Sequence, residues 1–163
     1  MPDDAEAIER ARVRAWRLAY RHVFPPEELD RMPIDGSRWR VQLEDGLLDE
    51  ACLVCEEGGD VVGWVRFGVG STPLLGEVHG LYVDPDAWST GAGRALMAGA
   101  EAELAGSYPA AVLWVLEAND RARRFYEAAG WSADGRRGTF ERFGVAAPVV
   151  GYRKSLSSSA SRS

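Results

Sequence analysis

A glycine turn between a strand-like segment and a helix-like segment is the part of the sequence best suited to chemistry. The stretch 81–96 begins with the apolar residues Leu81 to Val83, passes through Gly91-Ala92-Gly93, and continues into a helical pattern that starts at about Thr90. Because glycine has no Cβ, the backbone can bend sharply there, and a bulky diphosphate can approach the N–H groups of the first helical turn. The helix dipole adds partial positive charge at the same end. The turn therefore predicts an anion-binding pocket.

The two cysteines, Cys52 and Cys55, have a C-x-x-C spacing that in other settings binds a metal or performs redox chemistry. Either role would need partner ligands or a helix start next to the pair, and the sequence has neither. The apolar run 51–55 is strand-like, so residues three apart point to opposite faces. We expect buried structural thiols and no metal site.

Length and charge limit the classes of protein that this chain can represent. With 163 residues and 46% hydrophobic content, the chain is long enough for a single domain, expected over 1–156 and followed by a disordered polar tail at 157–163. The net charge of −6 argues against nucleic-acid binding and slightly favours a cationic partner. The sequence has no apolar run of membrane-spanning length and an acidic N-terminus, so we expect a cytoplasmic protein that binds no membrane.

Apolar periodicity and turn residues predict the elements that position the glycine turn. Helices are expected at 5–23, 27–32, 37–43, 90–105 and 120–129. Strands are expected at 51–56, 61–69, 77–83, 110–116, 139–143 and 149–156. The first two strands are joined by Gly58-Gly59, which suits a tight antiparallel hairpin, and a strand, helix, strand unit follows later. This order predicts an α/β (α+β) fold in which helices pack on both faces of a mixed sheet.

Two longer motifs stand in a fixed order along the chain. The first is Leu81-Tyr-Val-Asp-Pro85 followed by Gly91-Ala-Gly93-Arg-Ala-Leu96, and the second is Asn119-Asp-Arg-Ala122-Arg-Arg-Phe125-Tyr126-Glu-Ala-Ala-Gly130-Trp131. Together they resemble the GNAT superfamily of acyl-CoA-dependent N-acetyltransferases. The resemblance covers residues 51–156 and implies a mostly antiparallel central sheet, with a V-shaped splay between two parallel strands at 77–83 and 110–117. The implied reaction moves an acetyl group from acetyl-CoA to a primary amine by direct attack.

The resemblance also implies which groups would bind coenzyme A. The pantetheine arm would insert in the splay like a missing strand, held by backbone groups of Leu81, Tyr82 and Val83. The diphosphate would be held by backbone N–H groups of Ser89, Thr90, Gly91, Ala92, Gly93 and Arg94. Asn119 would bond the pantetheine or the substrate, cap a helix, or do both.

The chain departs from the family pattern at two places. Trp88 stands where the family usually has Gln or Arg, three residues before the first glycine, which predicts a lower affinity for the cofactor. The family's first strand is missing or shortened, because the helical pattern begins within a few residues of Met1. This second departure predicts an open sheet edge.

Three residues are candidates for the proton transfers that acetyl transfer needs. Tyr126 matches the family tyrosine that protonates the leaving thiolate, and its alternative role is a core aromatic beside Phe125. Glu77 matches a family glutamate that acts as base directly or through water, and its alternative is a solvated strand end. By strand alternation His79 lies on the face of Glu77 and Leu81, where it could share the role of base or be a structural histidine.

The acceptor pocket is expected between the first helix and the loop after it. Tyr20 and Phe24 are the candidate walls, with His79 beside them; Trp16 is expected in the core, and Trp39 is a further candidate. The acceptor would be a small-molecule or peptide amine. A peptide N-terminus, a lysine, a polyamine and an aminoglycoside all stay open, as does a homodimer.

Two alternatives to an acetyltransferase come from other functional classes. A catalytically idle acyl-CoA-binding module is kept open by Trp88. A dinucleotide-binding domain of Rossmann type is disfavoured because Leu96 stands at the third glycine position of G-x-G-x-x-G.

Overall fold

The computed structural model of the protein describes residues 5–34, 50–72 and 74–156. The helix expected at 37–43, Trp39 and the tail 157–163 lie outside this part. The helices are α1 (Ala5–Ala19), α2 (Pro26–Asp30), the short 3-10 helix η2 (Pro85–Ala87), α4 (Ala92–Ala105) and α5 (Asp120–Ala128). The strands are β1 (Glu50–Glu57), β2 (Asp60–Val69), β3 (Gly76–Val83), β4 (Ala110–Leu116), β5 (Ser132–Arg142) and β6 (Val145–Ser155).

The six strands form one sheet in the order β1-β2-β3-β4-β6-β5, and only the β3–β4 pair is parallel. The β1–β2 hairpin turns through Gly58 and Gly59, both with positive φ, as a primed two-residue turn requires. The apolar strand β4 lies inside the sheet, between β3 and β6. The predicted mixed, mostly antiparallel sheet is therefore confirmed, and a doubly wound parallel sheet is excluded.

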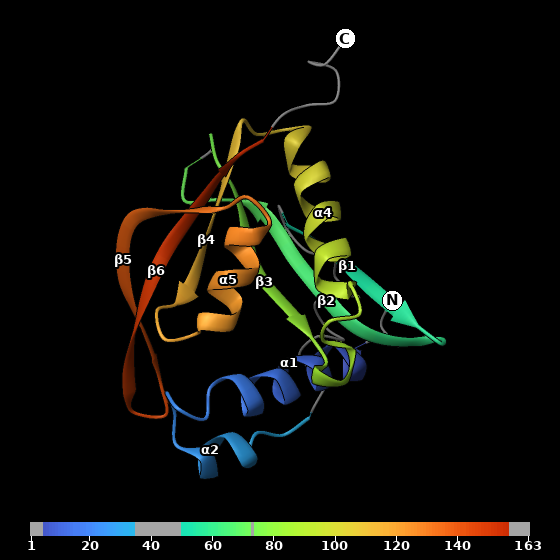
Figure 1. Ribbon diagram of the computed structural model, residues 1–163, viewed down its shortest axis with the longest axis vertical. Coiled ribbons are helices and arrows are strands. Elements are labelled where there is room, and N and C mark those ends of the chain that lie inside the picture. The colour runs from blue at the N-terminus through green and yellow to red at the C-terminus, as the bar shows by residue number, and fades with distance from the viewer. Residues whose placement is uncertain (1–4, 35–49, 73, 157–163) are drawn as a thin grey trace.

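Helices cover both faces of the sheet, as neighbouring residues of β2 show. Trp64 packs with Ile8 and other α1 residues, whereas Val65 points the other way into the core formed with α4 and α5. Figure 1 shows α4 and α5 together on one side of the sheet and α1 with α2 at its lower end. In the part of the chain described, α1 is the first element, and no strand precedes it.

The parallel strands β3 and β4 separate soon after they begin. They pair only from Gly76 opposite Ala111 to Val78 opposite Leu113, and both then continue unpaired with each other (Figure 1). A bulge on β3 lies at the same point, because Phe67 pairs with Val78 and Arg66 with Gly80, which leaves His79 without an opposite residue. The predicted V-shaped splay is confirmed.

The bulge corrects one prediction about the faces of β3. Strict alternation placed Glu77, His79 and Leu81 on one face, but Val78 and Leu81, three residues apart, both pack into the α4 side of the core. One extra residue in the strand reverses the alternation beyond it. Glu77 and Leu81 therefore lie on opposite faces.

The ends of several elements also differ from the prediction. The last hairpin is longer than expected, since β5 begins at Ser132 and β6 at Val145, with Phe143 and Gly144 turning at positive φ. Charged and glycine residues in the first half of β5 hide its alternation, and most of its side chains are exposed. At the other end of the chain α1 stops at Ala19, and α4 begins at Ala92 after the glycine turn.

The cysteines are free thiols on opposite faces of β1. Cys55 packs against the α4 side of the core, and Cys52 packs beside Trp64 on the α1 side, as the alternation predicted. Both are half-buried rather than fully buried, because β1 is the outer strand of the sheet. Burial, followed by the nearby Glu57 and Glu56, raises the pKa of the Cys55 thiol. In the part of the chain that the structure describes, no group of three metal-binding side chains is present.

Candidate active site

A cavity of about 1200 Å³ fills the opening between β3 and β4. Its walls come from β3 (Val78 to Val83), from β4 and the residues after it (Trp114 to Leu116 and Asn119), from the glycine turn, and from α1, α4 and α5. Since α1 and α4 cover opposite faces of the sheet, the cavity passes through the sheet at the splay. One molecule can therefore enter from the α4 side while another enters from the α1 side.

The edge of β3 that faces the cavity carries unpaired backbone groups. The Asp84 N–H donates to the Val62 carbonyl of β2 at 2.7 Å, and Tyr82 pairs with Trp64 of the same strand. Backbone groups of successive residues point to alternate sides, so those of Leu81 and Val83 point away from β2, toward the opening. The Val83 carbonyl already accepts from the Trp88 indole there, which leaves the Val83 N–H and the Leu81 groups for a ligand. An extended ligand can pair with this edge as an added strand would.

The start of α4 has the geometry of an anion site. Gly91 is the N-cap at φ +94°, and no side chain caps the helix, so the N–H groups of the first turn are left for a ligand. The Cβ of an alanine at Gly93 would lie 3.4 Å from the Phe125 ring, so the turn passes close to α5. Arg94 is exposed on the cavity wall. The anion pocket predicted from the glycines is thus present as a backbone arrangement.

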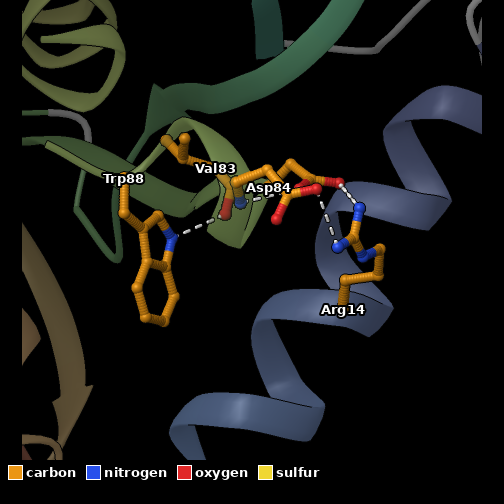
Figure 2. Close-up of polar contacts among 5 residues, drawn as sticks. Arg14, Val83, Asp84 and Trp88 are labelled. Carbon is orange, nitrogen blue, oxygen red and sulfur yellow. Dashed lines mark hydrogen bonds and ion pairs between the residues drawn. The ribbon is translucent and has the colours of Figure 1, made fainter. Parts of the chain in front are cut away.

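The loop between β3 and α4 is braced from both ends (Figure 2). The Trp88 indole Nε1 donates to the Val83 carbonyl at 2.8 Å, so the side chain folds back on the strand that precedes it. Asp84 accepts a hydrogen bond from the Asp86 N–H at 3.0 Å. It also forms an ion pair with Arg14 of α1 at 2.8 Å. Asp84 is 8% exposed, and Arg14 is its charged partner. These contacts hold the turn in place before any ligand arrives.

Trp88 also joins the two sides of the cavity mouth. The Arg121 guanidinium, on the first turn of α5, lies 4.1 Å from the centroid of the Trp88 ring. Both residues line the cavity. The stacking on Trp88 therefore holds a second arginine, Arg121, on the cavity wall that also carries Arg94.

Three tyrosines and Asn119 meet at the centre of the cavity. The Asn119 side chain caps α5 by accepting from the Ala122 N–H at 3.2 Å, and it lies near enough to the Tyr20 hydroxyl to affect its pKa. Burial raises the pKa of Tyr20 well above its ordinary value, and Tyr82 and Tyr126 raise it further, whereas Asn119 lowers it. Burial, with a smaller effect from Tyr82, also raises the pKa of Tyr126 well above its ordinary value. Both phenols therefore keep their protons at neutral pH.

The two candidate bases lie side by side, but only one of them lines the cavity. His79 Nδ1 is 3.4 Å from Glu77 Oε2. His79 is on the cavity wall at the bulge, where β3 leaves β4. Glu77 is opposite Val112 in the segment where the two strands still pair, and it is not among the lining residues.

The α1 side of the cavity is aromatic. The Trp16 ring lies 4.8 Å from Tyr20 and 5.8 Å from Phe140, and all three residues line the cavity. Phe24, a candidate wall residue, stacks on Trp16 at 5.9 Å but is 2% exposed and lies behind Trp16 in the core. Trp16, expected in the core, is 6% exposed and also lines the cavity.

Most of the predicted site residues meet at this one cavity. The lining includes Tyr20, His79, Leu81, Tyr82, Val83, Ser89, Thr90, Gly91, Gly93, Arg94, Asn119 and Tyr126. It does not include Glu77, Phe24 or Ala92. Sequence reasoning did not single out Phe140 for the site, because its strand sits far along the chain and carries no motif.

None of the helices that the structure describes is long and apolar enough to cross a membrane.

Comparisons with known proteins agree with this geometry. The model of the acetyltransferase (GNAT) family matches residues 10–131. A probable N-acetyltransferase of Mycobacterium tuberculosis is 36% identical over 159 residues, covering 93% of this chain and 88% of that protein. An uncharacterized N-acetyltransferase of Bacillus subtilis is 28% identical over 127 residues, covering 72% and 69%.

Two solved structures share the fold. The PaiA N-acetyltransferase of Thermoplasma acidophilum, in complex with coenzyme A, superposes with a TM-score of 0.72 at 17% identity, covering 95% of this chain and 94% of that one. An N-acetyltransferase of Staphylococcus aureus superposes with a TM-score of 0.71 at 19% identity, covering 96% and 94%. With the family match over most of its length, the chain belongs to the GNAT family of acetyltransferases and is an acyl-CoA N-acyltransferase enzyme.

Proposed function

We propose that this enzyme transfers the acetyl group of acetyl-CoA to the primary amine of a small molecule or peptide by direct attack. The observation that carries the proposal is the cavity through the splay, with an anion site at one side of the sheet and an aromatic wall at the other. A donor and an acceptor that enter from opposite sides would meet between β3 and β4. The solved relative with coenzyme A supports the same donor.

The residues present fit coenzyme A. The backbone groups of Leu81 and the N–H of Val83 suit an extended pantetheine arm, and the uncapped start of α4 suits a diphosphate. Arg94 and Arg121 line the same part of the cavity and add positive charge for phosphate groups. When bound, acetyl-CoA supplies a thioester whose carbonyl carbon is open to attack by an amine.

This chain supplies the proton acceptor for the amine. His79 lies on the cavity wall at the splay point, so we assign it, directly or through a water, the proton that the amine nitrogen loses as its bond to the carbonyl carbon forms. Glu77 lies 3.4 Å behind His79 and stabilises the charged imidazole. The Leu81 N–H, on the free edge, polarises the thioester carbonyl.

Tyr126 is the donor for the leaving sulfur. When the carbon–sulfur bond breaks, the Tyr126 hydroxyl donates its hydrogen toward the sulfur as negative charge develops there. Because burial raises the pKa of Tyr126, the phenol is protonated and ready for this role at neutral pH. Asn119 and Tyr20 line the same centre and orient the groups around it.

Release of free thiol from acetyl-CoA with a panel of primary amines tests the proposal. We expect amine-dependent release, and we expect Tyr126→Phe to lower kcat by about 10² or more, with the Kd for coenzyme A unchanged. Tyr108→Phe is the matched control, since Tyr108 packs on the same core but is not among the cavity-lining residues.

Two results would count against the proposal. Wild-type turnover in Tyr126→Phe would remove that residue from the reaction. If acetyl-CoA binds and no amine in the panel causes thiol release, acetyl transfer itself is wrong, and an idle acyl-CoA-binding module is favoured.

A further inference from the structure

Arg121 is exposed at the cavity mouth, and its guanidinium is nevertheless held in place. The residue lies on the first turn of α5, and its guanidinium carbon is 4.1 Å from the centroid of the Trp88 ring. Trp88 is itself fixed by the 2.8 Å hydrogen bond from its indole to the Val83 carbonyl (Figure 2). A guanidinium that stacks on a ring through its face keeps the N–H groups in its plane for a ligand. Because the side chain is already ordered, it loses less entropy on binding than a mobile arginine does.

The place of Arg121 in α5 does not account for its charge. A helix dipole disfavours a cation in the first turn, and Asp120, the residue before Arg121, is the one that suits that position. Arg124, three residues later on the same helix, is also exposed but is not among the cavity-lining residues, whereas Arg121 is. Of these two arginines, Arg121 is therefore the one placed to meet a ligand.

Coenzyme A carries a phosphate on the 3′ carbon of its ribose in addition to its diphosphate. With the pantetheine arm along β3 and the diphosphate at the start of α4, the nucleotide follows on the outer side of the turn, at the cavity mouth. The N–H groups of the first turn of α4, with Arg94 beside them, serve the diphosphate. Arg121 comes from a different helix and lies over Trp88 at the mouth, so it is available to the ribose phosphate. The oxygens of a terminal phosphate match the planar N–H fork of an arginine.

We infer that Arg121, positioned by Trp88, binds the 3′-phosphate of coenzyme A and makes the enzyme select donors that carry this phosphate. Dephospho-coenzyme A and the phosphopantetheine arm of a carrier protein lack the phosphate, and they are therefore weak ligands for this site. This inference rests on the proposed use of acetyl-CoA and gives that use a specificity-determining residue.

Calorimetric titration with coenzyme A and with dephospho-coenzyme A tests the assignment. We expect wild type to bind coenzyme A more tightly by about 5- to 30-fold, and Arg121→Gln to bind the two ligands about equally, with the Kd for dephospho-coenzyme A unchanged. Arg124→Gln is the matched control, since it removes the same charge from the same helix outside the cavity lining, and it should keep the wild-type preference.

Three results would count against these proposals. Equal binding of both ligands by wild type, or an equal loss of both in Arg121→Gln, overturns the role of Arg121 while the use of coenzyme A stands. The second of these results would assign Arg121 to the diphosphate. If wild type binds neither ligand, the proposed donor itself is wrong.

Two substitutions of Trp88 test whether its ring positions Arg121. Both Trp88→Phe and Trp88→Leu lose the hydrogen bond to the Val83 carbonyl, but only Trp88→Phe keeps a ring for the guanidinium. We expect the preference for coenzyme A over dephospho-coenzyme A to persist in Trp88→Phe and to fall by about 2- to 5-fold in Trp88→Leu. The ratio of the two Kd values is the measurement, because a general weakening of the turn would change both values alike. A wild-type ratio in Trp88→Leu refutes the positioning role of Trp88.

Discussion

Replacement of Trp88 by Phe tests whether this residue braces the anion turn or contacts the cofactor. The change removes the 2.8 Å hydrogen bond to the Val83 carbonyl and keeps a ring for Arg121 to stack on. A hydrogen bond of this kind contributes about 0.5–1.5 kcal/mol net, and weaker stacking on Phe costs up to about 0.5–1 kcal/mol more. We expect the free energy of unfolding to fall by about 1–2 kcal/mol, or Tm to fall by about 2–8 °C for a chain of this size.

Trp114→Phe is the matched control for this experiment. Trp114 also has a guanidinium over its ring, Arg136 at 4.4 Å, and its indole forms no hydrogen bond within the described residues. The control therefore loses only stacking, at most about 1 kcal/mol. The difference in the free energy of unfolding between the two variants measures the indole hydrogen bond.

Titration with coenzyme A then separates bracing from ligand contact. The turn keeps the Asp84 cap and the Arg14 ion pair in Trp88→Phe, so we expect the Kd for coenzyme A to change by less than about threefold. Calorimetry gives the Kd, and urea unfolding gives the stability. A Kd weakened tenfold with no loss of stability would refute the bracing role and make Trp88 a direct cofactor contact.

Two further predictions concern stability. Burial raises the pKa of Tyr126 above its ordinary value of 10.0. Above pH 10 the unfolded state therefore loses a proton that the folded state keeps. The free energy of unfolding is unaffected by this group below pH 10 and falls as the pH rises above 10. Urea unfolding at pH 9 and pH 11 should show a smaller decline for Tyr126→Phe than for wild type, and an equal decline would contradict the assignment. Gly91→Ala should cost about 1–2 kcal/mol because φ is +94° there, whereas Gly93→Ala, whose added methyl makes an ordinary contact with Phe125, should cost less. Equal losses in urea unfolding of the two variants would show that φ at Gly91 is not the constraint.

Much of the fold was predictable because its signals are local. The Gly58-Gly59 hairpin, the helical pattern of α1, the apolar β4 and the glycine turn each depend on neighbouring residues, and each is present in the structure. The first half of β5 was not predicted, because its charged and glycine residues are mostly exposed and show no apolar alternation. The family motifs carried the expected site residues, and most of these line one cavity.

The sequence by itself determined the family, the mixed sheet and the anion turn, because backbone preferences and short motifs act over a few residues. Only the tertiary structure decided that a bulge at His79 puts Glu77 and Leu81 on opposite faces of β3. It also decided that the Trp88 indole bonds the Val83 carbonyl, and that Arg14 pairs with Asp84, 70 positions away. It also brought Trp16 and Phe140 onto one wall. These contacts follow from how α1, the sheet and the last hairpin pack together, and residue types and spacing along the chain do not specify that packing.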